Sequence, residues 1–182
     1  MQGSKLLMLA DYLDSLLPGK TGMQQLLLLR DIVLVLLMWE TSMQGNNCGK
    51  LTCSDVFLPG GQPAPFPLCK PVARGTSLVL KPDGTKTAKG ERSGPFTLIA
   101  TEDSQHSCLV RLIQYLQHRY PAGQIQHRYL FSPLTSTQEG FADAPPTASA
   151  LGKRLNKHLQ DAGLYAGESK GEVKFRAWWH VG

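Results

Sequence analysis

The chain has few cysteines, and their spacing excludes the common metal-binding patterns. Cys48 and Cys53 lack the two-residue spacer of a zinc site, and no paired histidines follow them at the distance of a zinc finger. The remaining two, Cys69 and Cys108, add no regular spacing. The sequence therefore predicts reduced, partly buried thiols, as in an intracellular protein, and no bound metal.

Long apolar runs are also missing. The most apolar stretch, residues 26–39, is interrupted by Arg30 and Asp31 and leaves only eight uninterrupted apolar residues. A bilayer span needs about 18. The short apolar run at 6–9 is followed at once by Asp11, which does not fit a secretory leader. We therefore expect no membrane span and an intracellular protein, nuclear if the source is eukaryotic.

What the composition does contain is enough apolar material for one domain. Apolar residues make up 42% of the 182 residues, and the mean hydropathy is −0.17, as in ordinary globular proteins. The formal net charge is +5. A basic balance is compatible with a polyanionic partner, but many basic proteins have none.

Apolar periodicity and turn residues predict a mostly helical α+β fold with a small antiparallel sheet. Two β-like runs, 77–80 and 96–100, flank a polar, basic hairpin connection. Asn46, Asn47 and Gly49 indicate a turn, and proline-rich residues 58–75 indicate a loop. Residues 50–55 fit a short helix or loop, and residues 138–149 a polar linker ending in an N-cap. Helices are expected at 4–17, 24–43, 108–120 and 150–162, the last with Gly163 at its C-cap.

Three phrases occur in a fixed order along this pattern. They are WETSMQGNN at 39–47, GTKT at 84–87, and Phe175-Arg176 near the end. In this order and spacing, the chain resembles the catalytic domain of the tyrosine recombinases, the phage-integrase family, over roughly residues 24–176. The phrases are most similar to those of Crypton-like and DIRS-like transposon recombinases.

The resemblance implies both retained and lost catalytic positions. Lys86 matches the hairpin lysine, which donates a proton to the leaving oxygen, and Arg176 matches the second phosphate-binding arginine. Gln44 stands where the family has its first arginine, and Val173 stands where it has a histidine. Asp55 lies eleven residues beyond position 44, where the family carries an aspartate that opens the next strand.

The family's tyrosine nucleophile follows the second arginine, and no tyrosine follows Arg176 here. The resemblance therefore implies a C-terminally truncated catalytic domain at 23–182, preceded by a remnant helix and linker at 1–22. Basic residues around the hairpin are the expected non-specific DNA contacts: Lys81, Lys89 and Arg92.

These features together predict a recombinase-like protein derived from a mobile element. We expect it to be catalytically inactive, to bind no cofactor, and to bind DNA weakly and without sequence preference. The sequence leaves open whether it forms a homo-oligomer. Two alternatives remain open from the sequence. One is an active site-specific recombinase represented by an incomplete gene model, and the other is a small helical interaction module without a role on DNA.

Overall fold

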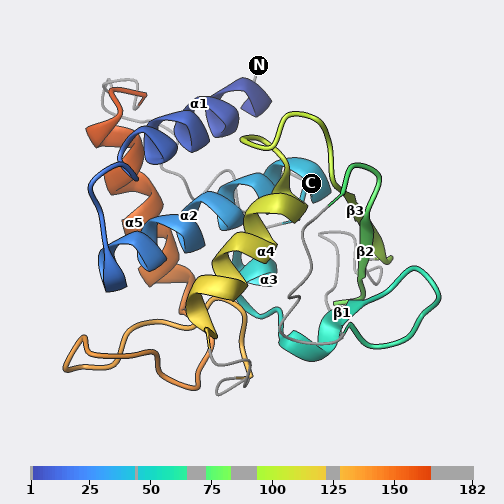
Figure 1. Cartoon of the computed structure of the whole chain (residues 1–182). Coiled ribbons are helices and arrows are strands. Elements are labelled where there is room, and N and C mark those ends of the chain that lie inside the picture. The colour runs from blue at the N-terminus through green and yellow to red at the C-terminus, as the bar shows by residue number, and fades with distance from the viewer. Residues whose placement is uncertain (1, 44, 65–72, 83–93, 122–127, 165–182) are drawn as a thin grey trace.

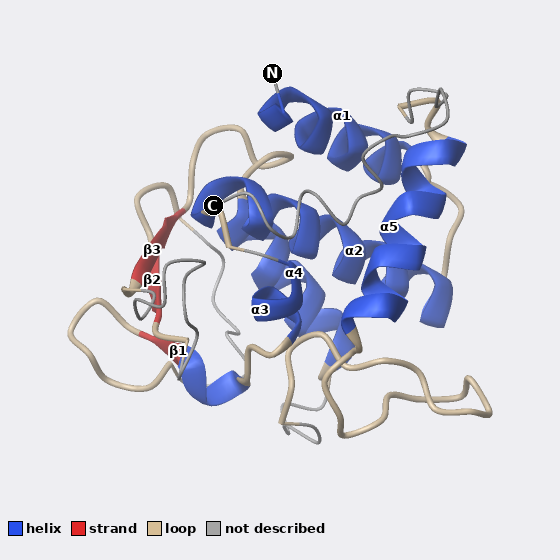
Figure 2. Cartoon of the chain, turned by 180° about the vertical axis from the view of Figure 1, so that it is seen from behind, coloured by secondary structure: helices blue, strands red, loops and turns tan. Residues whose placement is uncertain are grey.

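The computed structural model describes residues 2–43, 45–64, 73–82, 94–121 and 128–164. The four longer helices gather on one side, and a small sheet lies on the other (Figure 1). The reverse view shows the same division, with the sheet beside the helical cluster (Figure 2). The predicted α+β class with a small antiparallel sheet is confirmed for the described residues.

Helix α2, Gly22–Thr41, forms the centre of the core. Every residue from Leu28 to Met38 is buried, as expected for a helix that is apolar nearly all round. By length and composition α2 could also cross a membrane, but a buried core helix has the same properties. The helix ends where Ser42 adopts a left-handed backbone conformation, with φ of 53°.

Helices α1, Gln2–Ser15, and α4, Cys108–Arg119, both pack on α2. Leu9 and Leu13 of α1 are fully buried and belong to the same core as the buried residues of α4. α1 therefore shares one continuous hydrophobic core with the rest of the described chain.

Helix α5, Ala148–Asp161, is capped at both ends by the residues that flank it. Thr147 accepts a hydrogen bond from the amide of Ala150, so it is the N-cap in place of the predicted Ser149. At the other end Gly163 adopts φ of +66°, and the amides of Gly163 and Leu164 bond back to the carbonyls of Gln160 and Leu159. This double closure is a Schellman motif, and the predicted C-cap is confirmed.

The turn expected at Asn46, Asn47 and Gly49 is wrong, because these residues form the one-turn helix α3, Gly45–Gly49. Packing overrides their weak helix propensity: a side-chain carbon built on Gly49 would lie 2.9 Å from Leu151 of α5. The short 3₁₀ helix η1, Cys53–Asp55, then leads into the sheet, so residues 50–55 are partly helical, as expected.

The sheet has three antiparallel strands in the order β1-β2-β3: Val56–Phe57, Ser77–Leu80 and Phe96–Ile99. Its register pairs Val56 with Leu80, and Leu80 with Phe96. Leu78, Leu80 and Leu98 are buried, so one face of the sheet packs on the core.

The segment between α4 and α5 is packed rather than a free linker. Phe141 is buried, and Leu134 and Phe141 form an isolated antiparallel bridge. Tyr115 is fully buried, and its hydroxyl donates to the carbonyl of Leu130 at 2.8 Å. These contacts hold the described part of the segment against α4.

Candidate functional site

Most residues predicted for the site lie outside the described part of the chain. Of the predicted site residues only Lys81 is described, and its amide donates to the carbonyl of Asp55 at 2.8 Å. The convergence of Gln44, Lys86 and Arg176 on one phosphate, which the resemblance implies, stays a prediction. Those outside the described residues are Gln44, Lys86, Lys89, Arg92, Val173 and Arg176.

The described residues show which elements flank position 44 and the GTKT motif. Position 44 lies between the buried Met43 and the buried Gly45, at the junction of α2 and α3. The hairpin phrase belongs to the connection from β2 to β3, which leaves the sheet at the Leu80–Phe96 pair. The sheet thus carries Lys86 on its β2–β3 connection, as the sequence predicts.

Asp55 is a structural residue at the entrance to β1. Its carboxylate accepts hydrogen bonds from the amide and the hydroxyl of Thr52, at 2.7 and 2.8 Å. The aspartate is buried and closes the 3₁₀ turn. The predicted aspartate that opens the next strand is therefore present, and its side chain is occupied by backbone capping.

Lys81 is the one predicted DNA contact within the described residues. Its side chain is exposed, and its ammonium lies 4.6 Å from the centre of the Phe57 ring. For an exposed cation, a contact of this kind gains only about 0.5–1 kcal/mol. This contact therefore holds the ammonium only weakly.

A buried arginine on α4 was not predicted. Arg119 donates to the carbonyl of Tyr129 at 3.0 Å and to the hydroxyl of Ser132 at 3.0 Å. Its guanidinium lies 4.5 Å from the centre of the Phe141 ring and 5.1 Å from that of Tyr120. Backbone carbonyls and ring faces thus surround a charge that has no carboxylate partner among the described residues.

A second buried cluster surrounds Asp31 on α2. Arg30 donates to one carboxylate oxygen at 3.1 Å, while Arg154 and His158 of α5 both contact the other, His158 at 2.9 Å. Arg30 also donates to the carbonyl of Ser132. Burial alone would raise the pKa of Asp31, but Arg30, His158 and Arg154 outweigh it and lower the pKa to about 2.

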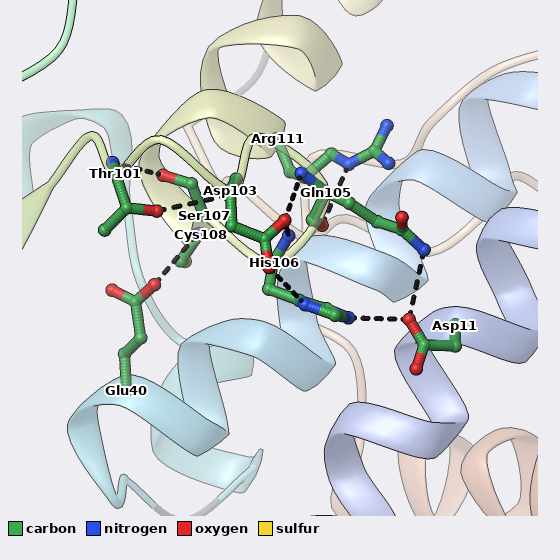
Figure 3. Close-up of polar contacts among 9 residues, drawn as sticks. All are labelled: Asp11, Glu40, Thr101, Asp103, Gln105, His106, Ser107, Cys108 and Arg111. Atoms are coloured by element: carbon green, nitrogen blue, oxygen red, sulfur yellow. Dashed lines mark hydrogen bonds and ion pairs between the residues drawn. The ribbon is translucent and has the colours of Figure 1, made fainter.

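His106 joins α1 to the start of α4. Its Nδ1 lies 2.7 Å from a carboxylate oxygen of Asp103, and its Nε2 lies 2.6 Å from Asp11 of α1 (Figure 3). Gln105 donates to the same oxygen of Asp11. The contact with Asp11, and then that with Asp103, raises the pKa of His106 despite partial burial. The protonated imidazole, a donor at both nitrogens, suits this position.

The amides of the first turn of α4 are capped by the residue before the helix and by a carboxylate from α2. Ser107 is the N-cap, and Glu40 of α2 accepts from the amide of Cys108 at 2.9 Å (Figure 3). A carboxylate suits the positive end of a helix. Burial raises the pKa of Glu40, and the hydrogen bond from Cys108 only partly opposes it.

His106, Ser107 and Cys108 are adjacent, but their contacts do not form a nucleophile with its base. Both ring nitrogens of His106 are engaged by carboxylates. Burial raises the pKa of the Cys108 thiol well above its usual range, which leaves it protonated and unreactive. Within the described residues, no group of three or more metal-ligating side chains could hold an ion.

The burial of Arg119, Arg30 and Asp31 was not predicted, although the sequence contained patterns that indicate it. Arg119 follows Leu112, Tyr115 and Leu116 at helical spacing, so it continues the buried stripe of α4. Arg30 and Asp31 interrupt the apolar run of α2 and are buried there. A charged pair at the centre of a buried helix indicates partners on neighbouring elements.

The Asp31 network predicts a loss of stability in acid. The pKa of Asp31 falls from 3.8 to about 2 on folding. Its ionised form therefore contributes roughly 2 kcal/mol, fully present above the unfolded value and lost as the pH falls towards 2. Asp31→Asn should lower the free energy of unfolding at pH 7 by about 3–5 kcal/mol, because the buried guanidinium of Arg30 loses its carboxylate partner. Urea unfolding monitored by circular dichroism measures both effects.

The control is Asp14→Asn, which removes a less buried carboxylate that pairs with Arg111. This change should cost no more than about 1 kcal/mol. Equal losses in the two variants, or unchanged stability of Asp31→Asn, would contradict a central role for the buried cluster.

Comparison with known proteins identifies no relative of this chain. No protein-family model, no curated protein and no solved structure matches it. Any function must therefore be argued from the sequence phrases and from the arrangement of the described elements.

Proposed function

We propose that this chain is a tyrosine recombinase-like protein derived from a mobile element. In this proposal it no longer carries out strand transfer and retains at most weak, sequence-independent binding to DNA. The proposal rests on the three sequence phrases and on the order of the elements that carry them.

One structural observation supports the proposal most: the sequence-predicted order of elements between positions 44 and 120. The long core helix α2 ends at Thr41, Asp55 directly precedes β1, and β2 pairs with β3 on either side of the connection that bears Lys86. α4 follows directly after β3. This is the order implied by the resemblance, with strands and helix within a residue or two of their expected bounds.

The proposed loss of activity follows from the residues at two positions, Gln44 and Val173. In phosphoryl transfer, negative charge spreads over the non-bridging oxygens, and planar guanidinium groups stabilise it with paired hydrogen bonds. Gln44 offers one neutral amide donor in that place. Removal of one such transition-state contact costs on the order of 10²–10³ in rate. Val173 has no group that could transfer a proton, where the family has histidine.

The proposed DNA binding is electrostatic. The expected contacts are few, namely Lys81, Lys86, Lys89, Arg92 and Arg176. Phosphate contacts of this kind carry no sequence information. Binding releases counterions condensed on the DNA, and this release is less favourable at higher salt, so the affinity falls as salt is added. Binding to duplexes of unrelated sequence should therefore be similar.

The binding prediction is tested by fluorescence anisotropy with labelled duplexes of several unrelated sequences. We expect dissociation constants of about 10⁻⁴–10⁻⁶ M, similar for all duplexes and steeply weakened by salt. Lys86→Gln together with Arg176→Gln should reduce the salt dependence, because two phosphate contacts are lost. Nanomolar, sequence-selective binding at physiological salt would contradict a weak relic, and no binding even at low salt would refute the DNA role.

The second prediction concerns covalent chemistry. On a nicked suicide substrate, the 182-residue chain should form no protein–DNA adduct on a denaturing gel. Gln44→Arg combined with Val173→His should also form none, since none of the five tyrosines matches the nucleophile's position after Arg176. An adduct from the unmodified chain, abolished when one of its tyrosines is changed to Phe, would show that the chain is an active enzyme.

A further inference from the structure

The imidazole of His106 lies between two carboxylates that belong to different parts of the fold. Its Nδ1 lies 2.7 Å from an oxygen of Asp103, in the same short segment, and its Nε2 lies 2.6 Å from an oxygen of Asp11 on α1 (Figure 3). The side chain of His106 is 31% exposed, so protons exchange with it from solvent. One titratable ring thus joins α1 to the segment that leads into α4.

This arrangement requires a proton on each ring nitrogen. An ionised carboxylate accepts hydrogen bonds and donates none, so both nitrogens of His106 have to donate. The imidazolium has two N–H groups, whereas the neutral ring has one N–H group and one lone pair. Loss of a proton therefore places a lone pair against a carboxylate oxygen at hydrogen-bond distance, and one of the two contacts has to break.

Local hydrogen bonds determine which contact breaks. The other oxygen of Asp103 accepts from the backbone amides of Gln105 and His106, at 3.1 and 3.3 Å. These bonds keep the carboxylate of Asp103 beside Nδ1 whatever the charge of the ring. The proton of a neutral His106 therefore stays on Nδ1, and the lone pair falls on Nε2, which faces Asp11 of α1.

The carboxylate of Asp11 has weaker support. Besides His106, its oxygen accepts from the exposed side chain of Gln105 at 3.0 Å, which is one neutral hydrogen bond. Further along α1, Leu9 and Leu13 remain in the core. When His106 loses its proton, α1 therefore stays part of the fold, but its attachment to the segment before α4 is weakened.

The two carboxylates in contact with His106 control its charge. The contact with Asp11, and then that with Asp103, raises the pKa of His106 above 6.5, its ordinary value. The other charged groups close to this segment are engaged by partners of their own: Glu102 pairs with Arg74, Asp14 with Arg111, and Glu40 of α2 accepts from the amide of Cys108.

We propose that His106 is a pH-sensitive clasp, which holds Asp11 of α1 when the ring is protonated and releases it when the ring is neutral. Because the pKa of the folded state lies above the ordinary value, the clasp is fully closed below pH 6.5 and opens as the pH rises through the folded-state pKa. The clasp does not depend on the proposed DNA role.

The closed clasp is tested by an NMR titration of the Cε1 proton of His106 in the 182-residue chain. We expect a pKa above 6.5 in the unmodified protein. Asp11→Asn, which keeps the size of the side chain and removes its charge, should lower that pKa. A pKa of His106 at or below 6.5, or one that Asp11→Asn leaves unchanged, would overturn the clasp.

The release of α1 is measured by amide hydrogen exchange at about pH 6 and about pH 8.5, on either side of the expected transition. The rates are expressed as protection factors, so that the intrinsic pH dependence of exchange cancels. Protection at residues 9–13 should fall by about two- to fivefold at the higher pH, as expected for loss of an exposed charge pair. Protection in β2 and β3 should not change.

The variant His106→Gln keeps an N–H donor but has no titrating group, so protection at residues 9–13 should be the same at both pH values. The matched control is His118→Gln. His118 is exposed on α4, and its Nδ1 contacts the carbonyl of Gln114 on the same helix at 2.8 Å. This control should keep the pH response of the unmodified chain. Circular dichroism confirms that both variants fold.

Two results of the exchange experiment would overturn the clasp. An equal fall of protection in the unmodified chain and in His106→Gln would assign the pH response to other groups, such as His158 beside Asp31. A fall in β2 and β3 as large as that in α1 would show a loss of global stability instead of a local release of α1.

Discussion

The buried carboxylate of Asp31 is the contact on which the arrangement of the helices depends. It accepts from Arg30 on its own helix and from Arg154 and His158 on α5, while Arg30 continues to the carbonyl of Ser132. One anion thus connects the central helix, the last described helix and the segment between α4 and α5. Removing a carboxylate from water is costly, and the balance is favourable here because two arginines and a histidine contact its two oxygens.

The same contact determines what α5 presents to solvent. With Arg154 and His158 turned towards Asp31, the remaining lysines of the helix are left outside. α3 packs closely against α5 through Gly49, and position 44 immediately precedes α3. α2, the one-turn helix α3 and α5 are therefore parts of one packed unit.

Much of the fold is predictable because its signals are local. The helix at 108–120 and the strands at 77–80 and 96–100 are found within one residue of their expected bounds. The sequence-based predictions fail where tertiary contacts determine the local structure. α3 forms from residues that favour a turn, because Gly49 permits close packing on α5. The pairing of His106 with Asp11 links residues far apart in sequence, and no local pattern specifies it. Of the predicted site residues, only Lys81 has a described position; the places of Gln44, Lys86 and Arg176 remain predictions.

The central claim of the proposed function is that the segment around position 44 and the β2–β3 connection contact DNA. The most direct measurement is an amide chemical-shift titration of the isotopically labelled chain with duplex DNA at low salt. The account predicts that the largest shifts fall in residues 45–50 and in the β2–β3 connection. Shifts confined to α1, or the absence of any shift at millimolar duplex, well above the ~10⁻⁴ M limit of non-specific binding, would contradict it.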